Sequence, residues 1–245
     1  MEQFRFPSNH GDLISDFNKT KILSEIKKYS IAGINQKIVD LKVLYVELDT
    51  SVYFDSNKVA SASELKSQVT SSLTHYSNSL DLNKFGGRFR YSKVLNVIDS
   101  TNNAITSNIT KVKIRRNIQV LPNQFTQYEL CFGNQFHVNK EGFNIKSTGF
   151  TIAGNSSLVY ITDIPNSDLK TGVISIVRKG SEGDISVVAK SAGTVDYVTG
   201  EVNLSTINIT STERSGNIIE IQAFPESNDV VGLKDLYLQL DISKT

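Results

Sequence analysis

The sequence predicts an α+β protein in which a small α/β module precedes a mainly antiparallel β region, built as a sandwich or a meander. Three observations support this class. Helical and strand periodicities alternate over about the first hundred residues. Short β-branched runs separated by Gly, Asn, Asp and Ser fill the remainder, and no helical stripe longer than two turns follows residue 105. We therefore expect two domains, a mixed module in residues 1–104 and a mainly β domain in residues 105–245.

The first module opens with a helix and then a strand. The run DFNKTKILSEIKKYS, which starts at Asp16, has apolar residues near helical spacing and lysines between them. The run KIVDLKVLYVELDTSVYFD, residues 37–55, has apolar side chains at alternate positions from Val39 to Tyr45. It predicts one long strand or two short ones.

Two further helices are predicted before residue 100. Ser61 and Glu64 stand three residues apart, as the two partners of a capping box do, which predicts a helix start at this point. The apolar stripe that follows comprises Leu65, Val69, Leu73, Tyr76 and Leu80. A shorter helical face comprises Tyr91, Val94, Leu95 and Ile98.

From residue 105 onward the pattern indicates strands. The run AITSNITKVKIRRNIQV, residues 104–120, reads as extended chain with apolar residues at mostly even offsets. The clearest hairpin is TVDYVTGEVNL, in which Val198–Gly200 form a tight turn between two β-branched arms. No repeat of fixed period occurs, which disfavours a solenoid or a propeller.

The composition argues against several classes of function. There are 26 basic and 25 acidic residues, so the chain lacks the basic excess that typifies nucleic-acid binding. No apolar run approaches the ~18 residues of a membrane span. Cys131 has no second cysteine to pair with, and His10, His75 and His137 lie in different segments without a convergent metal ligand. We expect a non-enzyme without metal, cofactor, small-molecule substrate, nucleic acid or membrane partner.

The run NKFGGRFRYSKV, residues 83–94, raises the question of a phosphate-binding loop. Gly86 and Gly87 follow a predicted helix and not a strand, and no Lys-Ser or Lys-Thr pair follows them, as a phosphate loop requires. Glycine also ends helices and reverses chains, because it adopts left-handed φ at little cost. We interpret the pair as a corner between two helices, with an anion-binding nest left open as an alternative.

Two basic segments are candidate contact surfaces. Arg88 and Arg90 flank an aromatic ring, so both guanidinium groups are expected to point to one side. In KVKIRR, the alternate basic residues share one face of a strand, which is either a solvated face or a surface for another chain. The candidate subunit-interface residues are Arg88, Phe89, Arg90, Tyr91, Lys111, Lys113 and Arg115.

Three segments carry a resemblance to a known family. They are DLKVLYVELDTSVYFD, FGGRFRYSKVLNVIDSTNNAITSNITKVKIRR and SAGTVDYVTGEVNL. Together they resemble the C-terminal part of the baseplate wedge subunits of T-even-type contractile-tailed phages, the gene-six product, which is related to the baseplate J-type proteins. The resemblance spans roughly residues 15–240 and is clearest over residues 40–116.

The resemblance implies a structural virion protein of the late class that is assembled in the host cytoplasm and located in the tail baseplate. Members of this family form homodimers, bind other wedge subunits and join a ring around the tail hub and tube. The residues themselves leave two alternatives. One is a glycan-binding or adhesin-like β module that uses Tyr128, Tyr160 and Tyr197. The other is a glycan-cleaving enzyme, for which the sequence offers no suitable pair of carboxylates.

Overall fold

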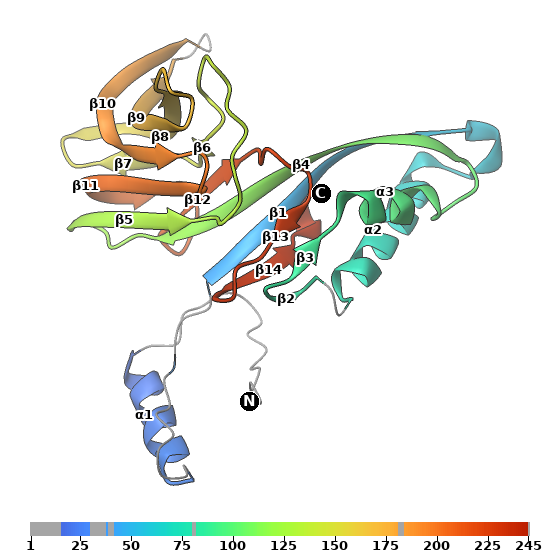
Figure 1. Ribbon diagram of the computed structural model, residues 1–245, viewed down its shortest axis with the longest axis horizontal. Helices are drawn as coiled ribbons and strands as arrows, with labels where there is room; N and C mark the ends of the chain where they lie inside the picture. The colour runs from blue at the N-terminus through green and yellow to red at the C-terminus, as the bar shows by residue number, and fades with distance from the viewer. Residues whose placement is uncertain (1–15, 30–37, 39–41, 80–81, 181–183, 245) are drawn as a thin grey trace. The chain divides into compact units, whose positions relative to one another are not determined.

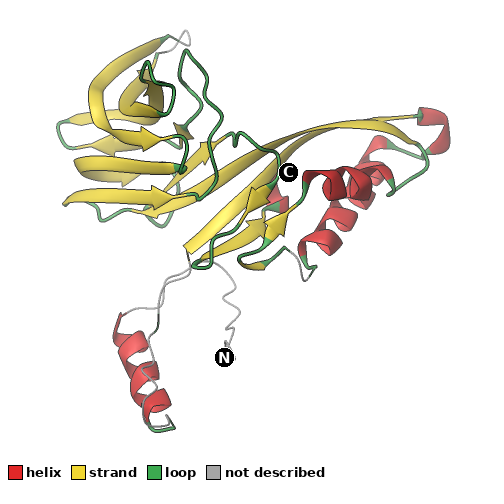
Figure 2. Cartoon of the chain, in the orientation of Figure 1, coloured by secondary structure: helices red, strands yellow, loops and turns green. Residues whose placement is uncertain are grey.

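The computed structural model describes residues 16–29, 38, 42–79, 82–180 and 184–244. The chain divides into two compact units, residues 1–42 and residues 43–245, and each is described by itself. Strands make up 49% of the described residues and helices 19%, and the β region is mainly antiparallel, which confirms the predicted α+β class (Figures 1 and 2).

In the first unit, the described residues form helix α1 (Asp16–Lys27), where the apolar spacing predicts it. An exposed ion pair follows its last turn, in which Lys28 Nζ donates to Glu25 Oε1 at 2.7 Å. Such a pair, three residues apart, adds only a few tenths of a kcal/mol.

The second unit is built on two long antiparallel strands, β1 (Lys42–Phe54) and β4 (Ile105–Gln119). Their register runs from Tyr45 opposite Arg115 to Phe54 opposite Ile105. β1 is a single long strand, which decides between the two alternatives that its sequence pattern allowed. Alternate residues of both strands, such as Val46 and Ile114, are buried in the core.

Helices α2 (Ala62–Ser77) and α3 (Tyr91–Asp99) pack against each other, and α3 also contacts β4 (Figure 1). The 3₁₀ turn η1 (Ser56–Lys58) connects β1 to this helical layer. The predicted stripe of α2 is confirmed at Leu65, Val69 and Leu73, which are buried. Leu80 lies outside the described residues.

Ser61 caps α2 as predicted, since its Oγ accepts a hydrogen bond from the backbone N–H of Glu64 at 3.2 Å. The carboxyl oxygen of Glu64 instead accepts from Gln68 Nε2, at 3.4 Å. Because the cap satisfies one unpaired N–H of the first turn, Ser61→Ala is expected to lower the free energy of unfolding by about 1 kcal/mol. Urea unfolding measures this change. Ser61→Asp, which keeps an acceptor at the cap, should lose much less than Ser61→Ala.

The remaining elements are strands of different lengths and one closing turn. They are β2 (Lys84–Phe85), β3 (Arg88–Phe89), β5 (Phe125–Cys131), β6 (Lys146–Ser147), β7 (Phe150–Ile152), β8 (Asn155–Pro165), β9 (Thr171–Lys179), β10 (Ile185–Asp196), β11 (Glu201–Thr212), β12 (Ile218–Ala223), β13 (Val230–Val231), β14 (Leu236–Leu240) and the 3₁₀ turn η2 (Ile242–Lys244).

The sheet order could not be read from the sequence. The main path runs β2-β14-β1-β4-β12-β6-β8-β7-β11-β10-β9, and β5 pairs with β11. Because β8 also pairs with β9, the strands β8, β9, β10, β11 and β7 form a closed cycle of antiparallel pairs. A closed cycle leaves fewer unpaired strand edges than an open meander does.

The predicted hairpin is confirmed between β10 and β11, where Val195 lies opposite Val202. Asp196 Oδ1 accepts hydrogen bonds from the N–H groups of Val198 and Thr199 and so stabilises the turn. Gly200 adopts φ +69°, and a Cβ there would lie 2.1 Å from the carbonyl oxygen of Asn134. A side chain at Gly200 would therefore combine a strained backbone with a steric clash.

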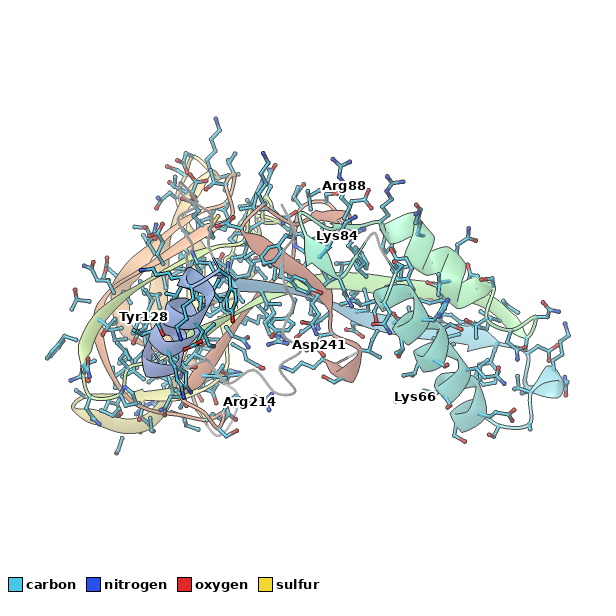
Figure 3. The ribbon with its side chains drawn as sticks, turned by 90° about the horizontal axis from the view of Figure 1, so that it is seen from below. Lys66, Lys84, Arg88, Tyr128, Arg214 and Asp241 are labelled. Atoms are coloured by element: carbon cyan, nitrogen blue, oxygen red, sulfur yellow. The ribbon has the colours of Figure 1, made fainter. Side chains whose placement is uncertain are left out.

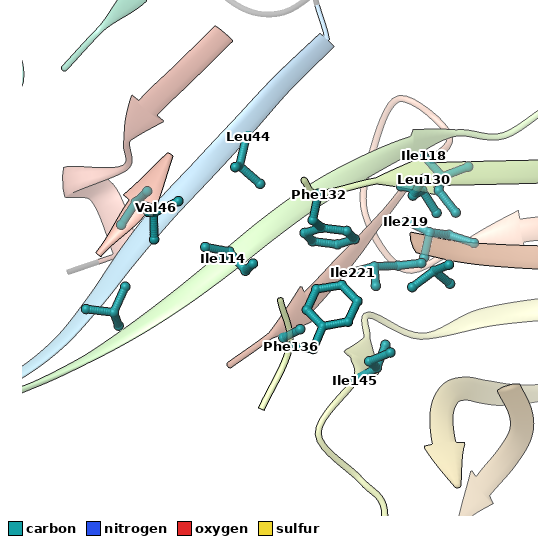
Figure 4. Close-up of a cluster of buried hydrophobic side chains, with 14 of the residues drawn as sticks. Leu44, Val46, Ile114, Ile118, Leu130, Phe132, Phe136, Ile145, Ile219 and Ile221 are labelled. Carbon is teal, nitrogen blue, oxygen red and sulfur yellow. The ribbon is translucent and has the colours of Figure 1, made fainter. Parts of the chain in front are cut away.

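One hydrophobic core runs through the second unit, from β1 and the helices to the strands beyond β4. Figure 4 shows part of it, where Phe132 and Phe136 lie edge to face with ring centroids 5.0 Å apart, near Ile114 and Ile221. The domain boundary at residues 104 and 105 stays a prediction.

Candidate subunit interface

The glycine pair forms a tight corner between two short strands, β2 and β3. Gly86 has φ +61°, the left-handed conformation that the sequence predicts. Gly87 is needed for a different reason, because a Cβ there would lie 2.2 Å from the carbonyl oxygen of Leu82. The corner thus lies between two strands, whereas the sequence pattern predicted a corner between two helices.

Arg88, Phe89 and Arg90 alternate as predicted. The ring of Phe89 is 1% exposed and packs into the core, whereas Arg88 and Arg90 are exposed. The backbone of β3 pairs with β13, with Phe89 opposite Val230 and Arg88 opposite Val231. The structure therefore presents the two guanidinium groups outward, and the ring is unavailable to a partner.

Tyr91 begins α3 and is held at both ends. Its N–H donates to Asp229 Oδ1 and its hydroxyl donates to the carbonyl oxygen of Thr110, both at 2.8 Å. The Asp229 carboxylate also lies at the positive end of the α3 dipole, which is a favourable place for it. These bonds fix the start of α3 to β4 and to the residue before β13, so Tyr91 has a structural role in addition to the contact role that the sequence suggested.

Two further basic residues were missed by sequence reasoning, namely Lys84 in β2 and Lys93 in α3. They line a small pocket together with Arg88 and Arg90. Figure 3 shows Lys84 and Arg88 near each other on the surface. The signal was present in the sequence, because residues 84–93 contain four basic and no acidic side chains.

Lys111 and Lys113 lie on the outward face of β4, as predicted. Lys111 is exposed, and Lys113 Nζ lies 3.7 Å from Asp49 Oδ2 on the neighbouring strand. An ion pair of this kind, exposed to water, contributes little to stability. Both lysines remain accessible to a partner.

Arg115 shares this face of β4 but is buried, with 3% of its surface exposed. Its guanidinium donates to Glu47 Oε1 and Asp241 Oδ2, each at 2.5 Å, and to Glu220 Oε1 at 3.2 Å. The expectation that it lies on an open basic face is therefore wrong. The reason is tertiary, because the chain after β14 brings Asp241 to Arg115. The Asp241 N–H donates to the carbonyl oxygen of Val46, in the neighbouring strand β1, at 2.8 Å.

Arg116 lies on the opposite face of β4 and is also buried. One of its terminal nitrogens donates to the carbonyl oxygen of Cys131, whereas its Nε has no hydrogen-bond partner among the described atoms. Burial lowers the pKa of this guanidinium from its ordinary value. The adjacent arginines of KVKIRR are thus both internal groups.

The described residues offer little for catalysis. Burial raises the pKa of the Cys131 thiol, which is the opposite of what an activated nucleophile needs. His75 is exposed on α2, and the exposed His137 pairs through Nδ1 with Glu226 Oε2 at 2.9 Å. In the described part of the chain, no three Asp, Glu, His or Cys side chains lie close enough together to form a metal site.

None of the helices described has the length and apolar composition needed to cross a bilayer. His10 lies outside the described residues.

The three tyrosines of the glycan-binding alternative are in different situations. Tyr197 is 1% exposed and donates its hydroxyl hydrogen bond to buried Asp163, so it cannot stack on a sugar. Lys179 Nζ lies 4.3 Å from the ring centroid of Tyr160, and the Tyr128 hydroxyl accepts from the Leu121 N–H at 3.2 Å. Only Tyr128 and Tyr160 remain partly accessible for that alternative.

Comparison with protein families gives a match. Residues 42–117 match the family described as baseplate structural protein gp6, C-terminal domain III. The matched segment begins at the first residue of β1 and ends within β4, so it includes the glycine corner and both helices of the second unit. No curated protein matches the chain.

This match falls on the segment where the sequence resemblance is clearest, and it confirms that resemblance. The chain has the features of the C-terminal portion of a gp6-type wedge subunit, with a structural role in the phage tail baseplate alongside other baseplate proteins. Over residues 42–117 the chain is thus similar to C-terminal domain III of baseplate structural protein gp6.

Proposed function

We propose that this protein dimerises and forms part of the ring around the tail hub and tube of a contractile phage tail, where it binds other wedge subunits. The observation that carries the proposal is the family match, which covers a continuous run of elements from β1 to β4. The exposed Arg88, Arg90 and Lys111 of the candidate interface all lie within that run, as does the half-buried Lys113. The role is structural and needs no catalytic group or cofactor.

Dimerisation is tested by light scattering on a size-exclusion column over a concentration series. A stable dimer near twice 27.1 kDa is expected. A strict monomer at all concentrations would contradict self-association of this chain. It would also favour the glycan-binding alternative, for which a glycan array would then give specific hits.

Replacing Arg88 and Arg90 together by alanine is expected to weaken incorporation into reconstituted wedge complexes by at least tenfold. Arginine at an interface pairs with carboxylates through two parallel hydrogen bonds, so its removal affects binding strongly. Both side chains are exposed, so the melting temperature should change by less than about 2 °C. A collapse of the melting temperature would show that the two arginines hold the fold and would contradict the interface role.

A further inference from the structure

Four basic side chains surround one small pocket at the glycine corner. Lys84, Arg88, Arg90 and Lys93 line it, and Tyr76 and Gly86 complete its wall. The pocket has a volume of about 130 Å³ and brings together α2, the β2–β3 corner and the first turn of α3. This volume suits one or two carboxylate groups and is too small for a folded ligand.

The backbone that carries these charges is fixed on both sides. Gly86 N–H donates to the carbonyl oxygen of Leu233 at 3.0 Å, and Gly232 N–H donates to that of Gly87 at 2.8 Å. On the flanks of the corner, β2 pairs with β14 and β3 with β13. A site on a fixed backbone loses less conformational entropy when it binds, which favours affinity.

Three of the four cations lack a counter-charge within the part of the chain that the structure describes. No carboxylate oxygen there lies within 4.0 Å of Lys84, Arg88 or Arg90. Arg115, by contrast, is bound by three carboxylates. Gathering Lys84, Arg88 and Arg90 without a carboxylate among the described residues is unfavourable for the isolated chain. An anionic occupant would remove that cost.

We propose that this pocket binds carboxylate side chains from an acidic segment of a neighbouring baseplate subunit of a different kind. This inference rests on the proposed function and adds the chemistry of the partner. The two arginines can each donate two parallel hydrogen bonds to a carboxylate, and the two lysines add compact positive charges.

The structure argues against two other occupants. In a two-fold contact of the chain with itself at this patch, the four cations would face four cations, which is repulsive. A nucleic-acid strand needs a continuous basic groove with several stacking rings. Here a net charge of +1 and one tyrosine at a 130 Å³ pocket provide neither.

The test uses the 245-residue chain and a fluorescently labelled hexaglutamate peptide, with binding followed by anisotropy at low salt. The R88Q/R90Q variant should raise the Kd at least tenfold, and K84Q alone should raise it about threefold. The matched control is R178Q/K190Q, which removes two exposed cations from β9 and β10 that also lack a carboxylate partner among the described residues. The control should change the Kd by less than twofold. Melting curves confirm that each variant is folded.

Three results would overturn the inference. They are the absence of saturable binding to the unaltered chain, an equal loss in R178Q/K190Q, and tighter binding of a thymidylate oligonucleotide of equal charge than of the peptide. The last result would assign the pocket to nucleic acid.

Light scattering separates this inference from the proposed function. A dimer that does not bind hexaglutamate refutes only the pocket, whereas a peptide-binding monomer refutes only the dimer.

Discussion

Replacing Arg115 by methionine is expected to lower the free energy of unfolding by about 3–5 kcal/mol, the usual cost of removing one partner from a buried ion pair. Methionine fills a similar length of space without charge. The variant leaves Glu47, Glu220 and Asp241 close together beneath the end of the chain, without the guanidinium that lies between them. Their mutual repulsion and lost hydrogen bonds produce the effect.

Other donors compensate only in part for the loss of Arg115. Lys244 Nζ lies 2.6 Å from Glu220 Oε1, and Gln222 Nε2 donates to Glu47 Oε2 at 2.5 Å. Asp241 Oδ2, however, has the Arg115 guanidinium as its partner at 2.5 Å. The ring of Tyr45 also loses a cation that lies 4.1 Å from its centroid. We expect the C-terminal segment to detach first, which hydrogen exchange at the Asp241 amide would show.

The matched control is Lys113→Met on the same strand face. Among the described residues, its carboxylate contact is with exposed Asp49 at 3.7 Å, so the expected loss is below about 1 kcal/mol. Urea unfolding of both variants provides the comparison. If Arg115→Met cost no more than Lys113→Met, the buried network would contribute nothing and this account of Arg115 would be wrong. Adding Glu47→Gln and Asp241→Asn to Arg115→Met should restore part of the stability, because it removes two of the three negative charges that the guanidinium neutralised.

Local structure in this protein could be predicted because its determinants are close in sequence. The α2 cap depends on Ser61 and the amide of Glu64, three residues apart, and the β10–β11 turn on Asp196 and the next three residues. Alternation across β3 likewise placed Phe89 inside and Arg88 outside. Each feature depends on backbone geometry that its own residues impose.

The burial of Arg115 could not be predicted, because its partners are far away in the sequence. Glu47 lies 68 residues from it and Asp241 lies 126 residues from it. No local pattern separates Arg115 from Lys113, since both occupy the same face of one strand. The closed cycle of strands has the same cause, because β7 pairs with β11 across about sixty residues. Which strands pair is decided by tertiary packing, and periodicity does not encode it.

The cationic pocket was predicted in part. The alternation around Phe89 identified Arg88 and Arg90, whereas Lys84 and Lys93 were missed because they lie in different elements. They come together only because Gly86 and Gly87 turn the chain between β2 and β3. A count of charges along residues 84–93 would have shown the excess, although not its convergence.

Replacing Asp163 by alanine is expected to cost about 3–5 kcal/mol of unfolding free energy, since it leaves two buried donors without an acceptor. Asp163 lies in β8 and is fully buried. Its Oδ1 accepts from the Ile145 N–H at 2.6 Å, and its Oδ2 accepts from the Tyr197 hydroxyl at 2.7 Å. The carboxyl group therefore joins the loop before β6 to the turn between β10 and β11.

Tyr197→Phe is the milder variant of the same site, and its expected cost is about 1–3 kcal/mol, because Asp163 keeps its bond from Ile145. The two substitutions share one hydrogen bond, so the double variant should cost less than the sum of the single variants. Strict additivity in urea unfolding would show that the Tyr197–Asp163 bond contributes nothing.

The pH dependence of stability gives an independent measurement on Tyr197. Burial, and after it the hydrogen bond to Asp163, raises the pKa of the Tyr197 phenol above its ordinary value. A group whose pKa is raised by folding contributes its stability below the unfolded pKa of about 10 and loses it as the pH rises further. The free energy of unfolding should therefore fall less steeply above pH ~10 in Tyr197→Phe than in the unaltered chain. Every other residue is the same in the two proteins and cancels from the comparison. Equal slopes would mean that the phenol of Tyr197 ionises as readily in the folded chain as in the unfolded chain, which contradicts its burial against Asp163.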